Sequence, residues 1–336
     1  MKIGDFDTHE RVLVIAEIGN NHEGDFAAAE EMLHLAAEAG ADVVKFQAIV
    51  PEHLVPPSQP ERLAQLKRFE LHPDQFAMLK TEADRAGVLF MCTPFDLPGV
   101  AMLDPLVPAF KVSSSDNDFF PLLEAVARTG KPVVLSSGLA DLDAVRRSVD
   151  AIRAVWRETG TGGDPVAVLH CAVSYPTPPE EVHLAAISEL LTLGVAVGYS
   201  DHALGIEAAV LSVAAGARVV EKHFTSDKRH SDFRDHQLSA DPAEFRVMVD
   251  RIREADMLLG RGRKRVQPTE ARAASSVRRS IAAARTLHVG ETLSFGDLAW
   301  LRGYAGLRPG EEDRVLGRRL LRDVAEGDFL RLEDLT

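Results

Sequence analysis

Eight short runs rich in β-branched residues recur between positions 12 and 225, and helix-like segments separate them. The runs are residues 12–19, 43–47, 88–95, 109–114, 132–138, 166–176, 195–202 and 219–225. Strands that alternate with helices usually pair in parallel, and eight such units are typical of a closed (β/α)8 TIM barrel. In such a barrel the active site lies at the carboxyl ends of the strands.

The runs end in side chains that a buried strand has no packing reason to carry. These strand-end residues are Glu17, Lys45, Gln47, Thr93, Lys111, Ser114, Ser136, Tyr175, Asp201, His202, Glu221 and His223. A buried charge is costly unless it is paired or functional. The pattern therefore indicates an enzyme whose site gathers these side chains at one mouth of the barrel.

Composition and charge narrow the class of protein. The chain has 336 residues, is 46% hydrophobic and carries a net charge of −13. That charge argues against nucleic-acid binding, although a local cluster of lysines can still hold a small anion. No apolar run is long enough to span a bilayer, and the first residues lack the apolar core of a signal peptide, so we expect a cytoplasmic protein. Cys92 and Cys171 fall on non-adjacent strands and are expected to be buried thiols in a reducing compartment.

Three segments are expected along the chain. Residues 1–262 would form the barrel and end in a helix at 243–260. Residues 263–277 are basic with little apolar periodicity, which favours a linker or an arm. Residues 278–336 contain short strand-like runs broken by glycine and proline turns, which predicts a small β-rich domain that leans on a neighbour. The glycine-rich residues 159–165 lack the ending of a phosphate-binding loop.

Two lysines end the second and fourth predicted strands. Lys45 and Lys111 each need an anionic partner inside a barrel. One interpretation is a pair of ion bridges to Glu17 and Asp116. The other is a cradle for a substrate phosphate and carboxylate, with neutral donors from neighbouring strand ends. Lysine is also the residue of imine-forming aldolases, so a Schiff-base mechanism stays open.

Two histidines end the seventh and eighth predicted strands, which are neighbours in a barrel. His202 and His223 can therefore converge on one metal ion. Two imidazoles without thiolates do not build a structural zinc site and suit Mn²⁺ or Mg²⁺ better. Glu221 or Asp201 could fix an imidazole tautomer. Glu17, a carboxylate among cations, is a plausible general base for a water molecule.

Several segments of the chain resemble the sialic acid synthase family, the phosphoenolpyruvate-dependent nonulosonate synthases. The matching pieces are AEIGNNHEG, AGADVVKFQ, CTPF, FKVSSSD, PVVLSSG, HCAVSYPTPPEEV, GYSDH, GARVVEKHFT and the aspartate of DHQLS. The segment RRSIAAARTLHVGETL at 278–293 resembles the opening of the family's C-terminal antifreeze-like (SAF) domain. The resemblance covers nearly the whole chain in the same order.

This resemblance implies a reaction and a set of roles. The family condenses phosphoenolpyruvate with the open-chain aldehyde of an N-acylated amino sugar, and phosphate leaves by C–O cleavage. Carried over to this sequence, the resemblance implies that phosphoenolpyruvate is held by Lys45, Lys111, Ser114 and Ser136, with Thr93 also at the substrate. It implies that the sugar is contacted by Gln47, Tyr175 and Asp235, and that a divalent metal is held by His202 and His223. Glu17 would activate the water, and Asp116 would stand at a proton-transfer position.

The resemblance also implies a domain-swapped homodimer, in which the small domain of one subunit caps the barrel of its partner. Arg302 falls where the family often places an arginine that reaches the acyl group of the sugar across the dimer. The alternative is an ordinary surface arginine on a small domain. A symmetric pair is also the commonest oligomer.

This chain departs from the family pattern at several positions of the expected site, among them one near the phosphate and one where the acyl group of the sugar should be recognised. Asp116 stands where several members carry Glu, and Val173 where members often carry Asn or Ser. Residues 302–306, RGYAG, replace the more usual Arg-Pro-Gly-Asn-Gly, and the segment between Gln47 and Phe69 is shortened. The acceptor therefore stays open between N-acetylmannosamine, a 2,4-diacetamido-trideoxyhexose and a less usual sugar.

Two rival functions remain at this point. One is a Schiff-base pyruvate aldolase that uses Lys45 or Lys111. The other is a non-catalytic sugar-binding protein on a relict barrel. The second rival predicts that some catalytic groups are lost, yet both lysines, both histidines and the candidate base are present.

Overall fold

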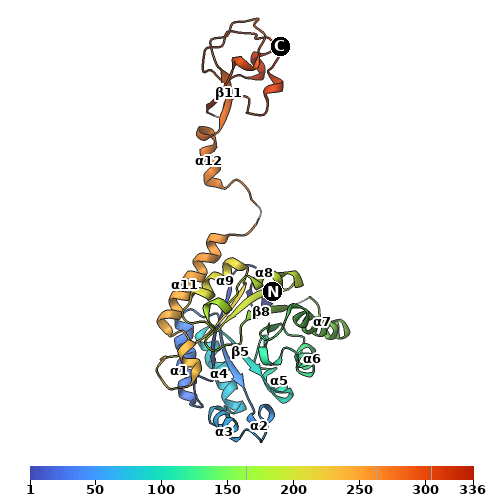
Figure 1. Cartoon of the computed structure of the whole chain (residues 1–336), viewed down its shortest axis with the longest axis vertical. Helices are drawn as coiled ribbons and strands as arrows, with labels where there is room; N and C mark the ends of the chain where they lie inside the picture. The colour runs from blue at the N-terminus through green and yellow to red at the C-terminus, as the bar shows by residue number, and fades with distance from the viewer. Residues whose placement is uncertain (164, 263, 304) are drawn as a thin grey trace. The chain divides into compact units, whose positions relative to one another are not determined.

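The computed structural model describes residues 1–163, 165–262, 264–303 and 305–336 (Figure 1). Asp164 of the glycine-rich segment, Arg263 of the expected linker and Tyr304 of RGYAG lie outside the described residues. The chain divides into two compact units, residues 1–260 and 261–336, which are described separately below.

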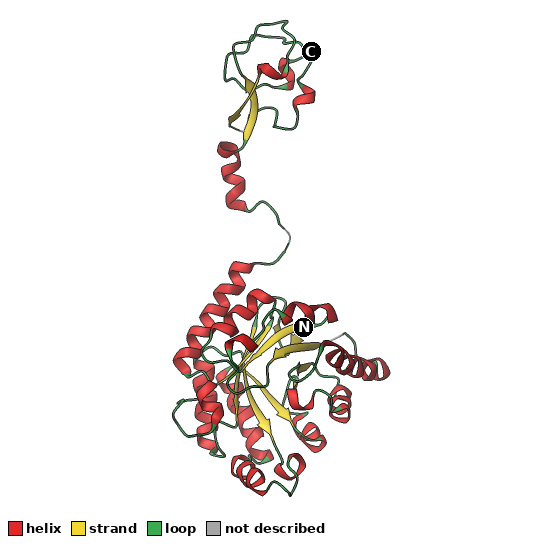
Figure 2. Cartoon of the chain, viewed as in Figure 1, coloured by secondary structure: helices red, strands yellow, loops and turns green. Residues whose placement is uncertain are grey.

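The first unit is built on a parallel eight-stranded sheet that curls into a nearly closed barrel (Figures 1 and 2). Its strands are β3 (Leu13–Gly19), β4 (Val43–Ala48), β5 (Leu89–Pro94), β6 (Phe110–Val112), β7 (Val133–Ser136), β8 (Val166–Cys171), β9 (Ala196–Asp201) and β10 (Val219–His223). The hydrogen-bonded order runs β5-β4-β3-β10-β9-β8-β7-β6, and β5 lies against β6 to complete the circuit. The predicted TIM barrel is confirmed.

Helices surround the strands of the barrel, and two of them also reach its mouth. They are α1 (Phe26–Glu38), α2 (Pro51–Leu54), α3 (Pro60–Phe69), α4 (Pro73–Ala86), α5 (Leu97–Leu103), α6 (Phe120–Arg128), α7 (Leu142–Thr159), α8 (Ala186–Leu190), α9 (Glu207–Ala215), α10 (Arg234–Leu238) and α11 (Pro242–Leu259). Within the described residues, no helix combines the length and apolar character needed to cross a membrane. A short hairpin, β1 (Lys2–Ile3) and β2 (Phe6–Asp7), precedes the barrel, and Ile3 packs among the interior residues.

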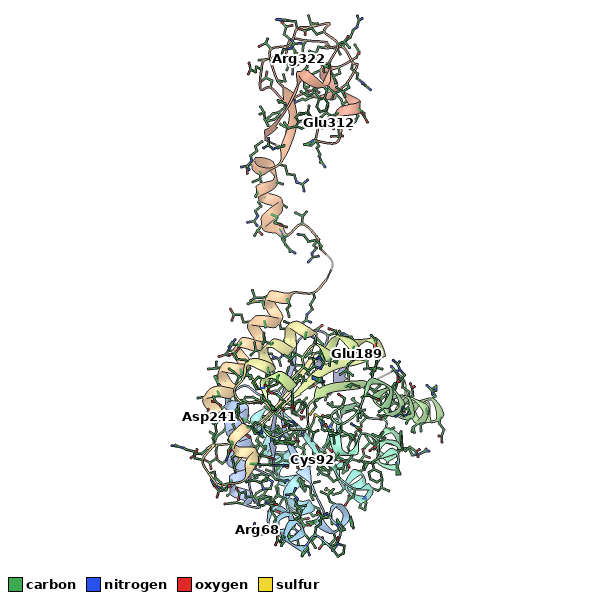
Figure 3. The ribbon with its side chains drawn as sticks, in the orientation of Figure 1. Arg68, Cys92, Glu189, Asp241, Glu312 and Arg322 are labelled. Carbon is green, nitrogen blue, oxygen red and sulfur yellow. The ribbon has the colours of Figure 1, made fainter. Side chains whose placement is uncertain are left out.

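The ends of the helices follow from local sequence. Asp141 caps α7 because its carboxylate accepts the backbone N–H of Ala144, and Gly160 ends the helix in the left-handed region at φ 73°. Asp241 caps α11 in the same way (Figure 3). Along α7 the buried residues recur three or four positions apart, which turns one face of the helix to the sheet.

The interior of the barrel changes from apolar to polar along each strand. Side chains alternate in and out of a strand, so every second residue points inward. On β3 the inward residues are Leu13 and Ile15, in the lower core, and then Glu17. The ladders pair Glu17 with Lys45 on β4 and with His223 on β10. The same alternation that places apolar side chains in the lower barrel thus places the polar side chains at the carboxyl ends of the strands inside the barrel opening.

Gly198 on β9 is required by close packing inside the barrel. A Cβ atom there would lie 2.2 Å from the carbonyl oxygen of Val219 and 2.5 Å from Cδ2 of Leu169. We expect Gly198→Ala to lower the free energy of unfolding by about 3 kcal/mol, because strand backbone must move to admit the methyl group. Urea unfolding followed by circular dichroism measures this. Gly162→Ala, with nothing within 4 Å, is the control and should change little.

The second unit is small and has little regular structure. It contains the mostly exposed helix α12 (Pro268–Val277) and an antiparallel pair, β11 (Arg279–Ala283) and β12 (Leu298–Arg302). Among its described residues, isolated bridges and three short 3-10 turns complete the β-rich framework around an apolar core that includes Ile281 and Leu330. The predicted small β-rich domain is confirmed, and helix α12 lies within the segment predicted to be a linker or an arm.

Candidate active site

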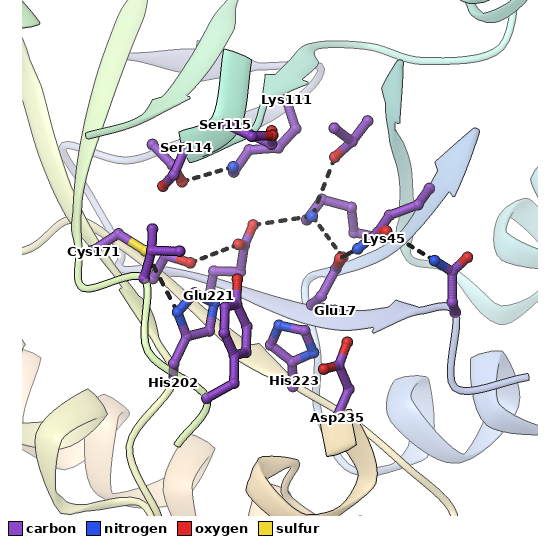
Figure 4. A pocket seen from close by; sticks show the side chains of 18 of the residues that line it. Glu17, Lys45, Lys111, Ser114, Ser115, Cys171, His202, Glu221, His223 and Asp235 are labelled. Carbon is purple, nitrogen blue, oxygen red and sulfur yellow. Dashed lines mark hydrogen bonds and ion pairs between the residues drawn. The ribbon is translucent and has the colours of Figure 1, made fainter. Parts of the chain in front are cut away.

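The carboxyl ends of the barrel strands surround a cavity of about 330 Å³ (Figure 4). Predicted site residues that line it are Glu17, Lys45, Gln47, Thr93, Lys111, Ser114, Ser136, Tyr175, His202, His223 and Asp235. Asp116 does not line the cavity, because its carboxylate turns back to accept hydrogen bonds from the hydroxyls of Ser113 and Ser115. Arg302 lies on β12 of the second unit and is exposed.

Lys45 lies at the centre of a buried cluster of charges. Its Nζ is 2.6 Å from Oε2 of Glu17 and 3.5 Å from Oε2 of Glu221, and it donates to Oγ1 of Thr93 at 3.3 Å. Burial acts to lower the pKa of Lys45, but the two carboxylates outweigh it and raise that pKa. Burial raises the pKa of Glu17 despite the neighbouring ammonium. One of the two ion bridges considered from the sequence is therefore present, with a second carboxylate added.

A chain of amides fixes the orientation of Glu17. Nε2 of Gln47 donates to Oε1 of Glu17 at 2.7 Å, and Nδ2 of Asn20 donates to Oε1 of Gln47 at 3.1 Å. Each carboxylate oxygen of Glu17 thus has its own partner, Gln47 on one side and Lys45 on the other. A carboxylate held at both oxygens presents a defined face to the cavity.

Among the described residues, the hydrogen-bond partners of Lys111 are all neutral. Its Nζ donates to Oγ of Ser136 at 2.7 Å and to the carbonyl oxygen of Val112 at 2.9 Å. Among the described residues, no carboxylate lies within 4.0 Å of this ammonium, so the second bridge considered from the sequence, to Asp116, is not formed. Burial lowers the pKa of Lys111. The charge of Glu221 reaches Lys111 from beyond 4.0 Å and only partly offsets this effect of burial. A buried ammonium with no carboxylate in direct contact is poised for an anionic ligand.

A tight turn beside Lys111 brings further donors to the cavity. Oγ of Ser114 accepts the N–H of Gly138 at 3.1 Å, and a Cβ on Gly138 would lie 2.6 Å from that oxygen and 2.5 Å from Val173. Asn117 fastens the turn by donating to the carbonyl oxygens of Ser136 and Gly138. Only glycine permits this close approach. Asn117 was not expected from the sequence, because it lies beyond the strand and outside any alternating pattern.

The two predicted metal-binding histidines face each other. Their ring centroids are 5.3 Å apart. Nδ1 of His202 lies 2.8 Å from the carbonyl oxygen of Ala172 and 3.6 Å from Sγ of Cys171. Because a carbonyl only accepts, Nδ1 carries a proton, and in the neutral ring Nε2 is the nitrogen that offers a lone pair to a ligand. Burial holds the pKa of His223 well below its usual value. Burial also acts to lower the pKa of His202, but the contact with Cys171 outweighs it and raises that pKa.

The predicted carboxylate partners of these imidazoles are elsewhere. Glu221 points into the barrel, where it accepts from Oγ of Ser200 at 2.8 Å and pairs with Lys45. Asp201 points to the outer face of the sheet and pairs with Lys222. The expectation that one of them fixes the tautomer was wrong for His202, because a backbone carbonyl does so.

Unsatisfied polar atoms remain at the histidine pair. In the described part of the chain, the buried Nδ1 of His223 has no hydrogen-bond partner. Asp235, whose pKa is raised by burial, also lies at this end of the cavity (Figure 4). The two imidazoles are a donor pair that suits a divalent ion, although their nitrogens and the Asp235 carboxylate do not all lie within 4.8 Å of one another among the described residues. A separate group of Glu30, His34 and Glu82, on α1 and α4, lies on the outer helices instead.

Two arginines at the cavity were missed by the sequence reasoning. The guanidinium of Arg234 stacks over the ring of Tyr175 at 4.6 Å, and that ring lies 4.2 Å from the ring of His202. Arg62 reaches the cavity from α3. Both come from segments outside the strands, where hydrophobic periodicity gives no signal for a site.

The fold and this mouth define a TIM-barrel enzyme whose site combines buried lysines, a fixed carboxylate and a pair of imidazoles. Comparison with protein families narrows the class further. The model of the NeuB family matches residues 32–264, and that of the SAF domain matches residues 278–336. The chain belongs to the NeuB family and is a phosphoenolpyruvate-dependent transferase of the nonulosonate synthase type.

Individual relatives match along almost their whole length. An uncharacterized protein of Methanocaldococcus jannaschii is 41% identical over 339 residues, covering 100% of this chain and 98% of that protein. The N,N'-diacetyllegionaminic acid synthase of Legionella pneumophila is 35% identical, covering 96% and 94%. The crystal structure of N-acetylneuraminic acid synthetase from Leptospira borgpetersenii, in complex with citrate, is 33% identical with a TM-score of 0.75, covering 81% and 94%.

Proposed function

We propose that this enzyme joins phosphoenolpyruvate to the open-chain aldehyde of an N-acylated amino sugar, with metal assistance, and releases phosphate by C–O cleavage. The product is a nonulosonic 2-keto acid. The observation that carries the proposal is one cavity that holds a buried lysine lacking a carboxylate partner and, beside it, two facing imidazoles. The lysine suits an anionic substrate, and the imidazoles suit a metal ion that binds the acceptor aldehyde. Because both lie in one cavity, the two substrates can come into contact there.

In the phosphoenolpyruvate half, Lys111 neutralises the phosphate, and Ser114 and Ser136 donate hydrogen bonds to it. Lys45 and Thr93, which are already hydrogen-bonded to each other, receive the carboxylate. The support for these roles is that all five side chains line the cavity. A preorganised ammonium stabilises charge as it develops on a leaving phosphate.

In the acceptor half, Gln47, Tyr175 and Asp235 receive the sugar. Two relatives that are each about one third identical to this chain are named as synthases of different products, a legionaminic acid for one and a neuraminic acid for the other. We therefore propose an N-acylated amino sugar, either N-acetylmannosamine or a 2,4-diacetamido-trideoxyhexose. We further propose a domain-swapped homodimer in which residues 263–277 connect a catalytic domain of residues 1–262 to the SAF domain of residues 278–336, and Arg302 reaches the acyl group in the partner's barrel.

His202 and His223 would hold a divalent ion, Mn²⁺ or Mg²⁺, with Asp235 beside them. The fit rests on Nε2 of His202, the nitrogen left for a ligand when Nδ1 donates to Ala172, and on Nδ1 of His223, which has no hydrogen-bond partner among the described residues. When bound, such an ion polarises an aldehyde oxygen and makes its carbon more electrophilic. The low pKa of His223 keeps its imidazole neutral and available as a ligand.

The remaining chemistry falls to residues of the chain. The methylene carbon of phosphoenolpyruvate bonds to the aldehyde carbon as the π bond of the aldehyde opens. The aldehyde oxygen takes up a proton to become a hydroxyl, and the carbon next to the methylene becomes electron-deficient. Water adds to that carbon while Glu17, aligned by Gln47, takes its proton. The C–O bond to phosphate then breaks as the added hydroxyl gives its proton to the departing phosphate and becomes the ketone oxygen, and phosphate leaves beside Lys111. Asp116 does not line the cavity, so we propose that it acts only by orienting Ser113 and Ser115.

Phosphate release from phosphoenolpyruvate tests the proposal. With Mn²⁺, we expect release that depends on N-acetylmannosamine or a diacetamido sugar. Substrate labelled with ¹⁸O at the bridging position should yield labelled phosphate, as C–O cleavage requires. Removing metal with a chelator should stop release, and added Mn²⁺ or Mg²⁺ should restore it. No release with any amino sugar, or unlabelled phosphate, would contradict the proposal.

The same preparation tests the Schiff-base alternative. Borohydride trapping of a pyruvoyl adduct without metal would favour an aldolase. Lys45 is a poor amine for this purpose, because its carboxylate partners raise its pKa and keep it protonated. Lys111, whose pKa is lowered, is the residue on which an adduct would be sought by mass spectrometry.

A further inference from the structure

An ion pair on the outer face of the barrel lies directly behind the two histidines. Nζ of Lys222 is 3.0 Å from Oδ2 of Asp201, and both side chains are at most 1% exposed. The β9–β10 ladder places these two residues opposite each other. Each immediately precedes one of the imidazoles, His202 on one strand and His223 on the other. The pair therefore links the two positions from which the histidines project.

The same pair encloses the backbone around His202. Oδ1 of Asp201 accepts the N–H of Ala203 at 2.9 Å, and Nζ of Lys222 donates to the carbonyl oxygen of Ala203. With the Lys222–Asp201 contact these bonds close a ring in which His202 is the central residue. The hydroxyl of Tyr199 donates to the same Oδ1 at 3.0 Å. Local bonds of this kind fix a backbone turn.

On the inner face, a second contact joins the same strands one position earlier. Ser200 donates to Glu221 there, so the strands are linked on both sides of the sheet. The inner pair lines the cavity, whereas Asp201 and Lys222 do not. The outer pair therefore cannot touch a substrate in this cavity. Any effect of Asp201 and Lys222 on catalysis must pass through the neighbouring residues His202 and His223.

Stability alone is a weak reason for such a pair. Burying two charges costs desolvation that their attraction only partly offsets, and apolar residues often replace them without loss. Buried ion pairs have a better-attested use in fixing the register of neighbouring elements. Here the register in question is that of two strand ends whose imidazole centroids are 5.3 Å apart.

We propose that Asp201 and Lys222 are positioning residues that hold His202 and His223 in the geometry of a divalent-metal site. The inference rests on the proposed metal-assisted function. Partners behind metal ligands typically change affinity by about 10–100-fold when they are removed. Neither residue is a ligand, so their loss should weaken metal binding while leaving the phosphoenolpyruvate half of the cavity intact.

The test is Mn²⁺ affinity of the full chain, measured by titration with electron paramagnetic resonance. The double variant Asp201→Asn/Lys222→Met removes both charges, and the asparagine can still accept from Ala203. Asp201→Asn alone is the second variant if the double variant does not fold. We expect the Mn²⁺ dissociation constant to rise about 10–100-fold, with phosphoenolpyruvate affinity in metal-free buffer within about twofold of wild type.

Arg218→Met supplies the matched control, because Arg218 forms an ion pair with Asp256 just before β10, at its opposite end. It should lower the melting temperature without changing Mn²⁺ affinity. Wild-type Mn²⁺ affinity in a folded Asp201 variant, or an equal loss in Arg218→Met, would overturn the inference and leave the proposed function standing. If the wild type did not bind Mn²⁺, that result would contradict the metal assistance in the proposed function. It would also overturn the inference about Asp201 and Lys222, which depends on that metal.

Discussion

Replacing Lys111 with methionine is expected to stabilise the protein and to destroy its affinity for phosphoenolpyruvate. Lys111 is 3% exposed, and its hydrogen-bond partners are a hydroxyl and a carbonyl. Burial lowers its pKa, and the charge of Glu221 only partly offsets this. A lowered lysine pKa means that the protonated form costs folding free energy at neutral pH. A methionine of similar length removes that cost, so the free energy of unfolding should rise by about 1 kcal/mol or more.

The same substitution takes away the charge that we propose for the phosphate. Truncating one member of a buried, hydrogen-bonded charge pair typically costs about 2–5 kcal/mol of binding. We therefore expect the dissociation constant for phosphoenolpyruvate to rise at least about 30-fold. Calorimetric titration without the sugar measures it, and urea unfolding of the same sample measures stability.

Lys45→Met is the matched control, because it removes the other buried lysine. It leaves Glu17 and Glu221 without their shared cation, which should cost about 3–5 kcal/mol of folding free energy. The two variants should thus move stability in opposite directions. If Lys111→Met destabilised the protein as much as Lys45→Met does, Lys111 would be a structural residue and not an unpaired cation held for a ligand.

The barrel and the position of its mouth were predictable because two periodic signals coincide. Strands show as β-branched runs, and polar residues accumulate only at their carboxyl ends. The alternation of inward and outward side chains along a strand is regular enough to predict which side chains point away from the cavity as well. On β9 and β10 the inward positions are Ser200 and Glu221, so Asp201 falls on the outer face by parity alone. The mistaken expectation for Asp201 came from its place beside His202 in the sequence.

Beyond the strands, that parity is lost and sequence reasoning weakens. Asp116 follows β6 on a 3-10 turn, and whether its carboxylate faces the cavity depends on two serine hydroxyls. Arg62 and Arg234 reach the site from α3 and α10, where an arginine is also an ordinary surface residue. Such positions depend on tertiary packing, which a pattern in the chain does not encode.

Replacing Glu17 with glutamine is expected to lower kcat by about a thousandfold while phosphoenolpyruvate affinity stays within a few-fold of wild type. Glutamine keeps the shape of the side chain and an oxygen that can accept from Gln47, but it cannot take a proton from water. Lys45 retains Glu221 as a counter-ion, so the fold should survive. Steady-state phosphate release gives kcat, and calorimetric titration gives the phosphoenolpyruvate affinity.

Gln47→Met separates the charge of Glu17 from its orientation. It leaves the carboxylate and its bond to Lys45 in place but removes the donor that aligns Oε1. We expect a smaller fall in kcat, about tenfold, because the carboxylate base remains but is no longer held in a fixed orientation. If Glu17→Gln kept kcat within about tenfold of wild type, proton removal from water would not depend on this carboxylate. Glu17 would then serve only as the counter-ion of Lys45, and the water would need another base among the residues of the cavity.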